Sequence, residues 1–110
     1  MRERAPSVPQ TAPKPEYETA IFSAELGDAP TIDLHQDIYQ LDPENAVSDF
    51  LDKAFMQGIE VVKIIHGRGQ QKLKHTIEHL LKQHSLVEYY RGSQKYGEEN
   101  GVTYAVLARK

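Results

Sequence analysis

The sequence contains no cysteine, and this absence excludes a disulfide framework and any metal site built on thiolate ligands. It also has no apolar stretch that could serve as the hydrophobic region of a signal peptide or as a membrane span. Both absences predict a soluble, cytoplasmic protein with no membrane partner. At 110 residues, the chain has room for one small domain with its own core.

Proline is scarce outside the beginning of the chain, since four of the six prolines fall within the first fifteen residues. Together with the Ser, Thr, Gln and Ala around them, they predict that residues 1–18 form a flexible, proline-rich tail. Residues 19–30 are apolar enough to pack against a domain, but their pattern indicates neither helix nor strand. Regular patterns begin at Thr31, so residues 31–110 are expected to form the folded domain.

The two signs of charge are unevenly distributed along the chain. Residues 16–60 carry eleven acidic side chains and a single cation, Lys53, whereas residues 63–95 carry seven cations and two acids. A basic half within a chain of net charge −3 is compatible with a local polyanion-binding surface. Ordinary solvated surface charge explains the same asymmetry equally well.

Hydrophobic periodicity from Thr31 onward predicts four strands and two helices. Alternating and continuous β-branched runs are typical of strands, whereas apolar residues spaced by three and four are typical of amphipathic helices. The first helix has clear ends, because Asp42 is a good N-cap, Pro43 suits the first helical position and Gly58 supplies a stop. The expected strands cover residues 31–35, 59–66, 86–91 and 102–109, and the helices residues 42–57 and 70–84.

The order β-α-β-α-β-β predicts an α/β fold with two layers. Strands separated by a helix are expected to run parallel with right-handed crossovers, which places both helices on one face of the sheet. The other face is then expected to be open, with Lys63 pointing out of it. Tyr89, Tyr90 and Tyr104 fall in the last two strands, where they can stack on a nucleobase or, more commonly, pack in the core.

The stretch "IIHGRGQQKLK" indicates an anion site between a strand and a helix. Free backbone N–H groups and the helix dipole favour an anion at a helix N-terminus, and Gly67 and Gly69 allow close approach of a ligand. Arg68 can hold a phosphate with two donors. Lys72 and Lys74 oppose the dipole in the first helical turn, which is better explained if an anion joins them. The alternative is an ordinary strand-to-helix turn that needs glycine for its geometry.

A second group of polar residues surrounds the same sheet edge. Asp33 and His35 are two residues apart in an expected strand, which places them on one sheet face, about 7 Å apart. The first two strands should end at the same edge, where His35 and His66 converge. Such groups can support general acid–base hydrolysis of a phosphodiester, or help to hold a divalent metal such as Mg²⁺ or Mn²⁺. The alternative makes Asp33 a turn or cap partner and His35 a surface residue.

The segment "HTIEH" matches the H-x-x-E-H pattern of inverted zinc peptidases. His75 and His79 share a helix face, but Lys72 and Lys82 lie on that face too and disfavour a dication. The chain is also too short for such an enzyme. A polar, outward-facing helix is the better interpretation, with His84 as a half-buried residue on the apolar stripe.

With both motifs in view, residues 31–109 resemble an Smr (small MutS-related) domain. The family's "[IL]-D-L-H-G" appears as "IDLHQ" (32–36) and its "H-G-x-G-x-G-x-L-[RK]" as "HGRGQQKLK" (66–74), and the closing "NGVTYAVL" is also similar. The resemblance implies an α+β two-layer sandwich like the C-terminal domain of a bacterial initiation factor. Its four-stranded mixed sheet would have the order 1-2-4-3, with the fourth strand antiparallel to the others.

The resemblance also implies function. Members of the family bind nucleic acid, and many are endonucleases of RNA or DNA, linked to mRNA cleavage at stalled ribosomes or to DNA repair. Carried over by position, Asp33 and His35 would be the active-site pair. His66, Gly67 and Gly69 would form the phosphate loop, with Lys74 as a basic contact.

Three departures from the family pattern are visible. Gln36 replaces the glycine after "DLH", Gln71 replaces the third glycine of the second motif, and Glu98 and Glu99 lie in the loop before the last strand. Despite these departures, we expect a monomeric endonuclease that hydrolyses RNA or DNA. The alternative is a non-catalytic module that binds nucleic acid or the ribosome.

Overall fold

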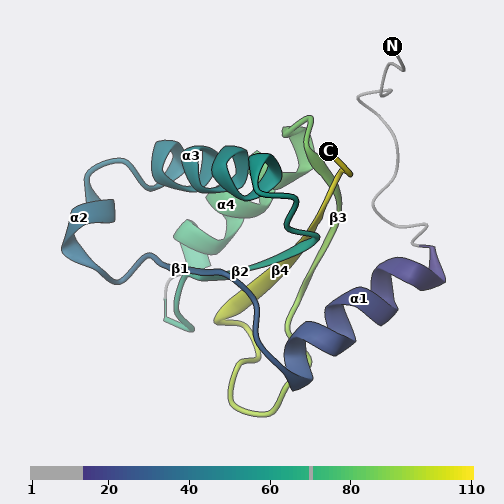
Figure 1. Cartoon of the computed structure of the whole chain (residues 1–110). Helices are drawn as coiled ribbons and strands as arrows, with labels where there is room; N and C mark the ends of the chain where they lie inside the picture. Colours follow the sequence, from purple (N-terminus) through teal and green to yellow (C-terminus); the bar gives the residue numbers. More distant parts are fainter. Residues whose placement is uncertain (1–13, 70) are drawn as a thin grey trace.

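The computed structural model describes residues 14–69 and 71–110 (Figure 1). Four helices and four strands follow one another along this part of the chain. They are α1 (Pro15–Leu26), β1 (Thr31–Asp33), α2 (Asp37–Gln40), α3 (Pro43–Met56), β2 (Val61–Ile65), α4 (Gln71–Gln83), β3 (Val87–Gly92) and β4 (Val102–Leu107). No helix among the described residues is both long and apolar enough to cross a membrane.

The four strands form one mixed sheet in the order β1-β2-β4-β3. β1 and β2 are parallel, whereas β4 runs antiparallel to both of its neighbours, β2 and β3. This confirms the sheet order and the strand directions that the resemblance implied. The parallel pair matters for the site, because its two strands end at the same edge of the sheet.

Helix α3 begins and ends where its sequence signals predict. The carboxylate of Asp42 accepts a hydrogen bond from the backbone N–H of Asn45 at 3.1 Å, and Pro43 occupies the first helical position. Gly58, just beyond the helix, has a φ of 75°, which favours glycine. The cap fixes where α3 starts, directly beside the sheet edge that carries the candidate site.

The main core lies between the sheet and the pair α3 and α4. One face of each element contributes to it, as the periodicity predicts. Its buried residues are Ile32, Leu34, Val47, Leu51, Ala54, Val62, Ile64, Ile77, Leu81, Val87, Ala105 and Leu107.

The other face of the sheet is covered by α1, so the prediction of an open face is wrong. Ile21 of α1 is fully buried in a second apolar cluster with strand residues that include Tyr89 and Tyr104. The helix begins at Pro15, within the segment expected to be a tail, and Figure 1 shows it across the sheet from α3 and α4. Its weak amphipathic pattern explains why periodicity missed it. Of the expected tail, residues 1–13 lie outside the described residues.

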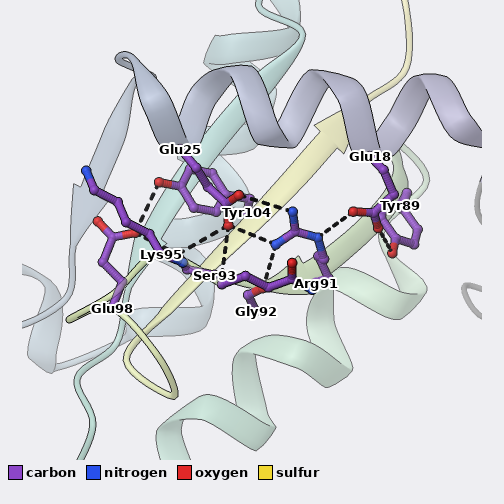
Figure 2. A network of polar contacts seen from close by, with 10 residues as sticks. Glu18, Glu25, Tyr89, Arg91, Gly92, Ser93, Lys95, Glu98 and Tyr104 are labelled. Carbon is purple, nitrogen blue, oxygen red and sulfur yellow. Dashed lines mark hydrogen bonds and ion pairs between the residues drawn. The ribbon is translucent and has the colours of Figure 1, made fainter.

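Ion pairs attach α1 to the sheet (Figure 2). Two strand cations that could have bound a polyanion, Lys63 and Arg91, have partners within the protein. Arg91 lies between Glu18 and Glu25 of α1, with nitrogen–oxygen distances of 2.7 and 2.9 Å. On the same sheet face, Lys63 pairs with Glu98 at 2.6 Å. Neither cation is therefore left to attract a polyanion.

The tyrosines of this sheet face are also held by contacts within the protein. Burial and a hydrogen bond to Glu18 raise the pKa of Tyr89 to about 12, and burial also raises the pKa of Tyr104. Both side chains are buried, at 7% and 1% exposure. Their role is core packing, as the commoner alternative held, and the base-stacking alternative does not fit this face.

Candidate active site

The site lies at the edge where the parallel strands end. His35 follows β1 and His66 follows β2, and both line one pocket of about 430 Å³ together with Lys72 of α4. Glu44, at the beginning of α3, also lines this pocket. The topology thus brings His35 of the first motif beside His66 and Lys72 of the second, and the parallel strands account for the convergence of the two histidines.

Asp33 and His35 form a hydrogen-bonded pair rather than two parallel side chains on a strand. β1 ends at Asp33, because the Asp33 carboxylate accepts the backbone N–H of His35 at 3.0 Å and so bends the chain. The same Oδ1 lies 2.9 Å from His35 Nδ1. When Nδ1 donates this bond, Nε2 is left as the basic nitrogen of the ring. The 7 Å separation was wrong, and the turn produces an oriented imidazole.

His66 is buried and has one partner. Its Nε2 lies 2.9 Å from the hydroxyl oxygen of Thr103, a fully buried residue of β4. Its Nδ1 is buried without a hydrogen bond. Burial lowers the pKa of His66, and the nearby charges of Lys74 and His35 lower it further, although the Gly67 backbone opposes this. The lowered pKa favours the neutral ring, and its Nδ1 is enclosed by the protein.

The glycine-rich loop is held from behind by residues that precede β4. The carbonyl of Gly101 accepts hydrogen bonds from the backbone N–H groups of His66 and Gly67, both at 3.0 Å. A Cβ at Gly101 would lie 2.8 Å from Arg68 Cγ and 3.2 Å from the Arg68 nitrogen. Gly101 and Thr103 are thus site residues that the sequence motifs did not reveal, although the "NGVT" resemblance contained the signal.

The glycines of the loop have different reasons to be glycine. Gly67 has a φ of 94°, a conformation that residues with a Cβ rarely adopt. Gly69 has open space around it, since an added Cβ would meet nothing within 4 Å. The backbone conformation therefore requires glycine at position 67. At position 69 there is room for a side chain, so packing against the protein does not require glycine there.

The cations of the motif occupy three different settings. Arg68 is exposed, and Lys72 lines the pocket. Lys74 is half-buried, with its ammonium 3.5 Å from the side-chain oxygen of Asn100. Gln71, at the start of α4, donates from its side chain to the Arg68 carbonyl at 3.2 Å, so the residue that replaces a family glycine supports the loop.

The acids of the loop before β4 lie away from the pocket. Glu98 bonds to Lys63, Ser93 and Tyr104, and its pKa is lowered because these bonds outweigh the opposing effect of its burial. Glu99 accepts the backbone N–H of Gly97. Neither carboxylate lines the pocket.

The donor set gives no ready metal cage. Within residues 14–69 and 71–110, no three His, Asp or Glu side chains are grouped so that they could hold a metal ion. Mg²⁺ and Mn²⁺ prefer oxygen ligands, and Oδ1 of the Asp33 carboxylate already bonds to the backbone and ring of His35. The same finding applies to "HTIEH", whose His75 and His79 are exposed on α4, as expected for a polar helix face. His84 is half-buried, also as expected.

Comparison with known proteins identifies the family. The Smr domain family model matches residues 32–108. Endonuclease MutS2 of Caldicellulosiruptor saccharolyticus is 36% identical over 95 residues, which cover 83% of this chain and 12% of that protein. Endonuclease MutS2 of Clostridium botulinum is 41% identical over 75 residues, covering 64% of this chain and 9% of that protein.

The fold has a solved counterpart in the Smr domain of Thermus thermophilus MutS2. The TM-score is 0.66 at 22% identity, and the match covers 73% of this chain and 99% of the other. The chain spans an eighth or less of the length of the MutS2 relatives it matches. This chain belongs to the Smr domain family.

Proposed function

We propose that this Smr domain binds the backbone of RNA or DNA at the edge of its sheet and hydrolyses a phosphodiester bond there. The observation that carries the proposal is the pocket shared by His35, His66 and Lys72, with Asp33 bonded to His35. The relatives named as endonucleases support the reaction class. Ribosome-associated cleavage and DNA repair are the settings that the family resemblance suggests.

The groups divide the chemistry by their environment. The first N–H groups of α4, together with Arg68, Lys72 and Lys74, hold the non-bridging phosphate oxygens. His35, oriented by Asp33, accepts the proton of the attacking water through Nε2. The leaving oxygen takes a proton from the solvent as its bond to phosphorus breaks, and His35 returns its proton to the solvent. His66, held neutral by its burial, lines the pocket as a hydrogen-bonding group rather than as a cation.

A non-catalytic nucleic-acid- or ribosome-binding module is the second candidate. One observation favours it: the His35 and Asp33 side chains are 57% and 37% exposed. Water around an exposed pair weakens its electrostatic effect on a reacting group. The phosphate-binding part of the proposal is common to both candidates.

One assay separates the candidates. The purified protein is incubated with labelled RNA and with supercoiled plasmid, with and without Mg²⁺ or Mn²⁺, beside the Asp33→Ala/His35→Ala double variant. We expect cleavage by the wild type and none by the variant. Cleavage that persists in the variant would indicate a contaminant, and binding without cleavage in every condition would establish the module.

The phosphate loop is tested by affinity at several salt concentrations. Arg68→Ala and Lys74→Ala should each weaken binding and reduce the salt slope by about 1 per lost phosphate contact. Lys53→Ala, which removes an exposed cation from α3, serves as the matched control. Unchanged affinity and slope in both loop variants would overturn phosphate binding at this loop.

A further inference from the structure

The exposed face of α4 carries a stripe of ionisable residues that leads away from the pocket. Lys72, His75, His79 and Lys82 are all exposed, and their spacing of three, four and three residues places them on one side of the helix. The stripe begins at the pocket itself, since Lys72 lines it. At the rise of an α-helix, the four residues span about 15 Å.

A second hollow connects the stripe to the pocket. It is lined by His75 and His79 and by three residues that also line the first pocket, namely Glu44, Lys72 and Thr76. The two hollows are therefore neighbouring parts of one surface between the start of α3 and the exposed side of α4. A chain-like ligand seated in the pocket has a direct path along this surface.

The ionisable side chains along this path are free of ion pairs in the described part of the chain. None of the ion pairs among residues 14–69 and 71–110 involves Lys72, His75, His79 or Lys82. The opposite side of the sheet differs, because there Lys63 and Arg91 are both paired with glutamates. The protein thus leaves donors unpaired on the face that adjoins the pocket, where a polyanion would need them.

Glu44 is the one acid at the junction of the two hollows. Glu78 is half-buried and lies one helical turn from His75 and Lys82, but it forms no ion pair with either of them. A metal is not the ligand of His75 and His79, since the described residues contain no group of three metal donors. The lysine ammonium groups and imidazole N–H donors of the stripe suit a chain of phosphates.

We propose that the exposed face of α4 is the track along which a single polynucleotide strand continues from the pocket, with its phosphates bound by Lys72, His75, His79 and Lys82. This inference rests on the proposed function and extends it, because it assigns the binding of the nucleotides that flank the reacting phosphate. RNA and DNA share the backbone chemistry that the track recognises. Glu44 opposes this binding at the junction.

The test measures fluorescence anisotropy of labelled single-stranded RNA and DNA of about twelve nucleotides, long enough to cover the track. Lys82→Ala should reduce the salt slope by about 0.7 for a single strand, and His75→Ala/His79→Ala should weaken affinity. Glu44→Gln should strengthen it. Lys53→Ala, an exposed cation on α3, should change neither quantity. A dinucleotide, whose single phosphate occupies the pocket and does not extend along the track, should bind the α4 variants as it binds the wild type.

The outcomes distinguish failure of the α4 track from failure of the proposed function. If the wild type binds no polynucleotide, the proposed function fails and the track fails with it. If the wild type binds but the α4 variants match it, the track alone is overturned. An equal loss of affinity in Lys53→Ala would show diffuse charge attraction instead of a track. Displacement by polyglutamate as effective as by polynucleotide would assign the surface to an acidic protein partner.

Discussion

The Nε2 of His66 lies 2.9 Å from the hydroxyl oxygen of Thr103, and both residues are buried. This contact joins the residue after β2 to β4 and engages Nε2 of His66, whereas Nδ1 is buried without a hydrogen bond. A residue outside both sequence motifs thus positions a central group of the site.

Thr103→Val should disorder His66 without changing the shape of the core. The valine leaves a buried ring nitrogen unsatisfied, so we expect the free energy of unfolding to fall by about 1–3 kcal/mol. The rate of cleavage should fall while the affinity for substrate changes little. Thr103→Ser keeps the hydroxyl and should restore the rate. Equal rates for the valine variant, the serine variant and the wild type would contradict a positioning role.

Gly101→Ala should displace the phosphate loop. Its Cβ would lie 2.8 Å from Arg68 Cγ and 3.2 Å from the Arg68 backbone nitrogen, and the loop must move to accept it. Overpacking of this kind costs about 1–3 kcal/mol. Urea denaturation measures the cost, and polynucleotide affinity measures the effect on the loop. Gly92→Ala is the control, since its Cβ would make only an ordinary contact at 3.9 Å.

His66 should make the protein less stable at mildly acidic pH. Its pKa in the folded protein is lowered from 6.5, mainly by burial, so the unfolded chain binds a proton more readily. The stabilisation is complete above pH 6.5 and is lost as the pH falls from there through the lower folded pKa. The free energy of unfolding, measured between neutral and mildly acidic pH, should show this slope.

The slope should disappear in His66→Gln. An NMR titration of the His66 ring in the wild type gives the same answer without a substitution. A ring that titrates above its ordinary value would contradict the buried, neutral state.

Glu25→Ala should release α1 from the sheet. Glu25 and its partner Arg91 are 6% and 13% exposed, and the carboxylate also accepts the backbone N–H of Gln94 at 2.8 Å. Removing one member of a buried pair typically costs about 3 kcal/mol, because the other charge stays buried. Glu16→Ala, an exposed acid on the same helix, should cost less than about 0.5 kcal/mol. Equal urea midpoints for the two variants would show that α1 does not depend on this network.

The sequence predicted the elements whose signals are local and strong. The cap and proline of α3, the β-branched run of β2 and the spacing of α4 are patterns that tertiary contacts reinforce, so these elements formed as expected. The convergence of His35 and His66 followed from the parallel pair alone. The sheet order depended on the family resemblance, since periodicity does not determine strand neighbours.

The features that the sequence did not predict also have physical explanations. α1 is held by Ile21 and a few acids that find partners far along the chain, such as Arg91, and no local pattern announces such pairs. The four-residue helix α2 has no buried residue and hence no periodic signal. The Asp33–His35 contact was mistaken for a strand spacing because the carboxylate bends its own backbone. Thr103 and Gly101 became visible only once β4 was placed beside β2.

The Asp33–His35 pair is proposed to perform acid–base chemistry on a bound phosphodiester. The most direct measurement is the single-turnover cleavage rate at saturating protein for the wild type, Asp33→Asn and His35→Gln, with Asp49→Asn of α3 as a control. Loss of general acid–base catalysis should lower the rate by about 10²–10⁴ in His35→Gln, with a smaller fall in Asp33→Asn and unchanged binding in both. Wild-type rates in both variants, or no cleavage by a wild type that binds its substrate, would contradict the account.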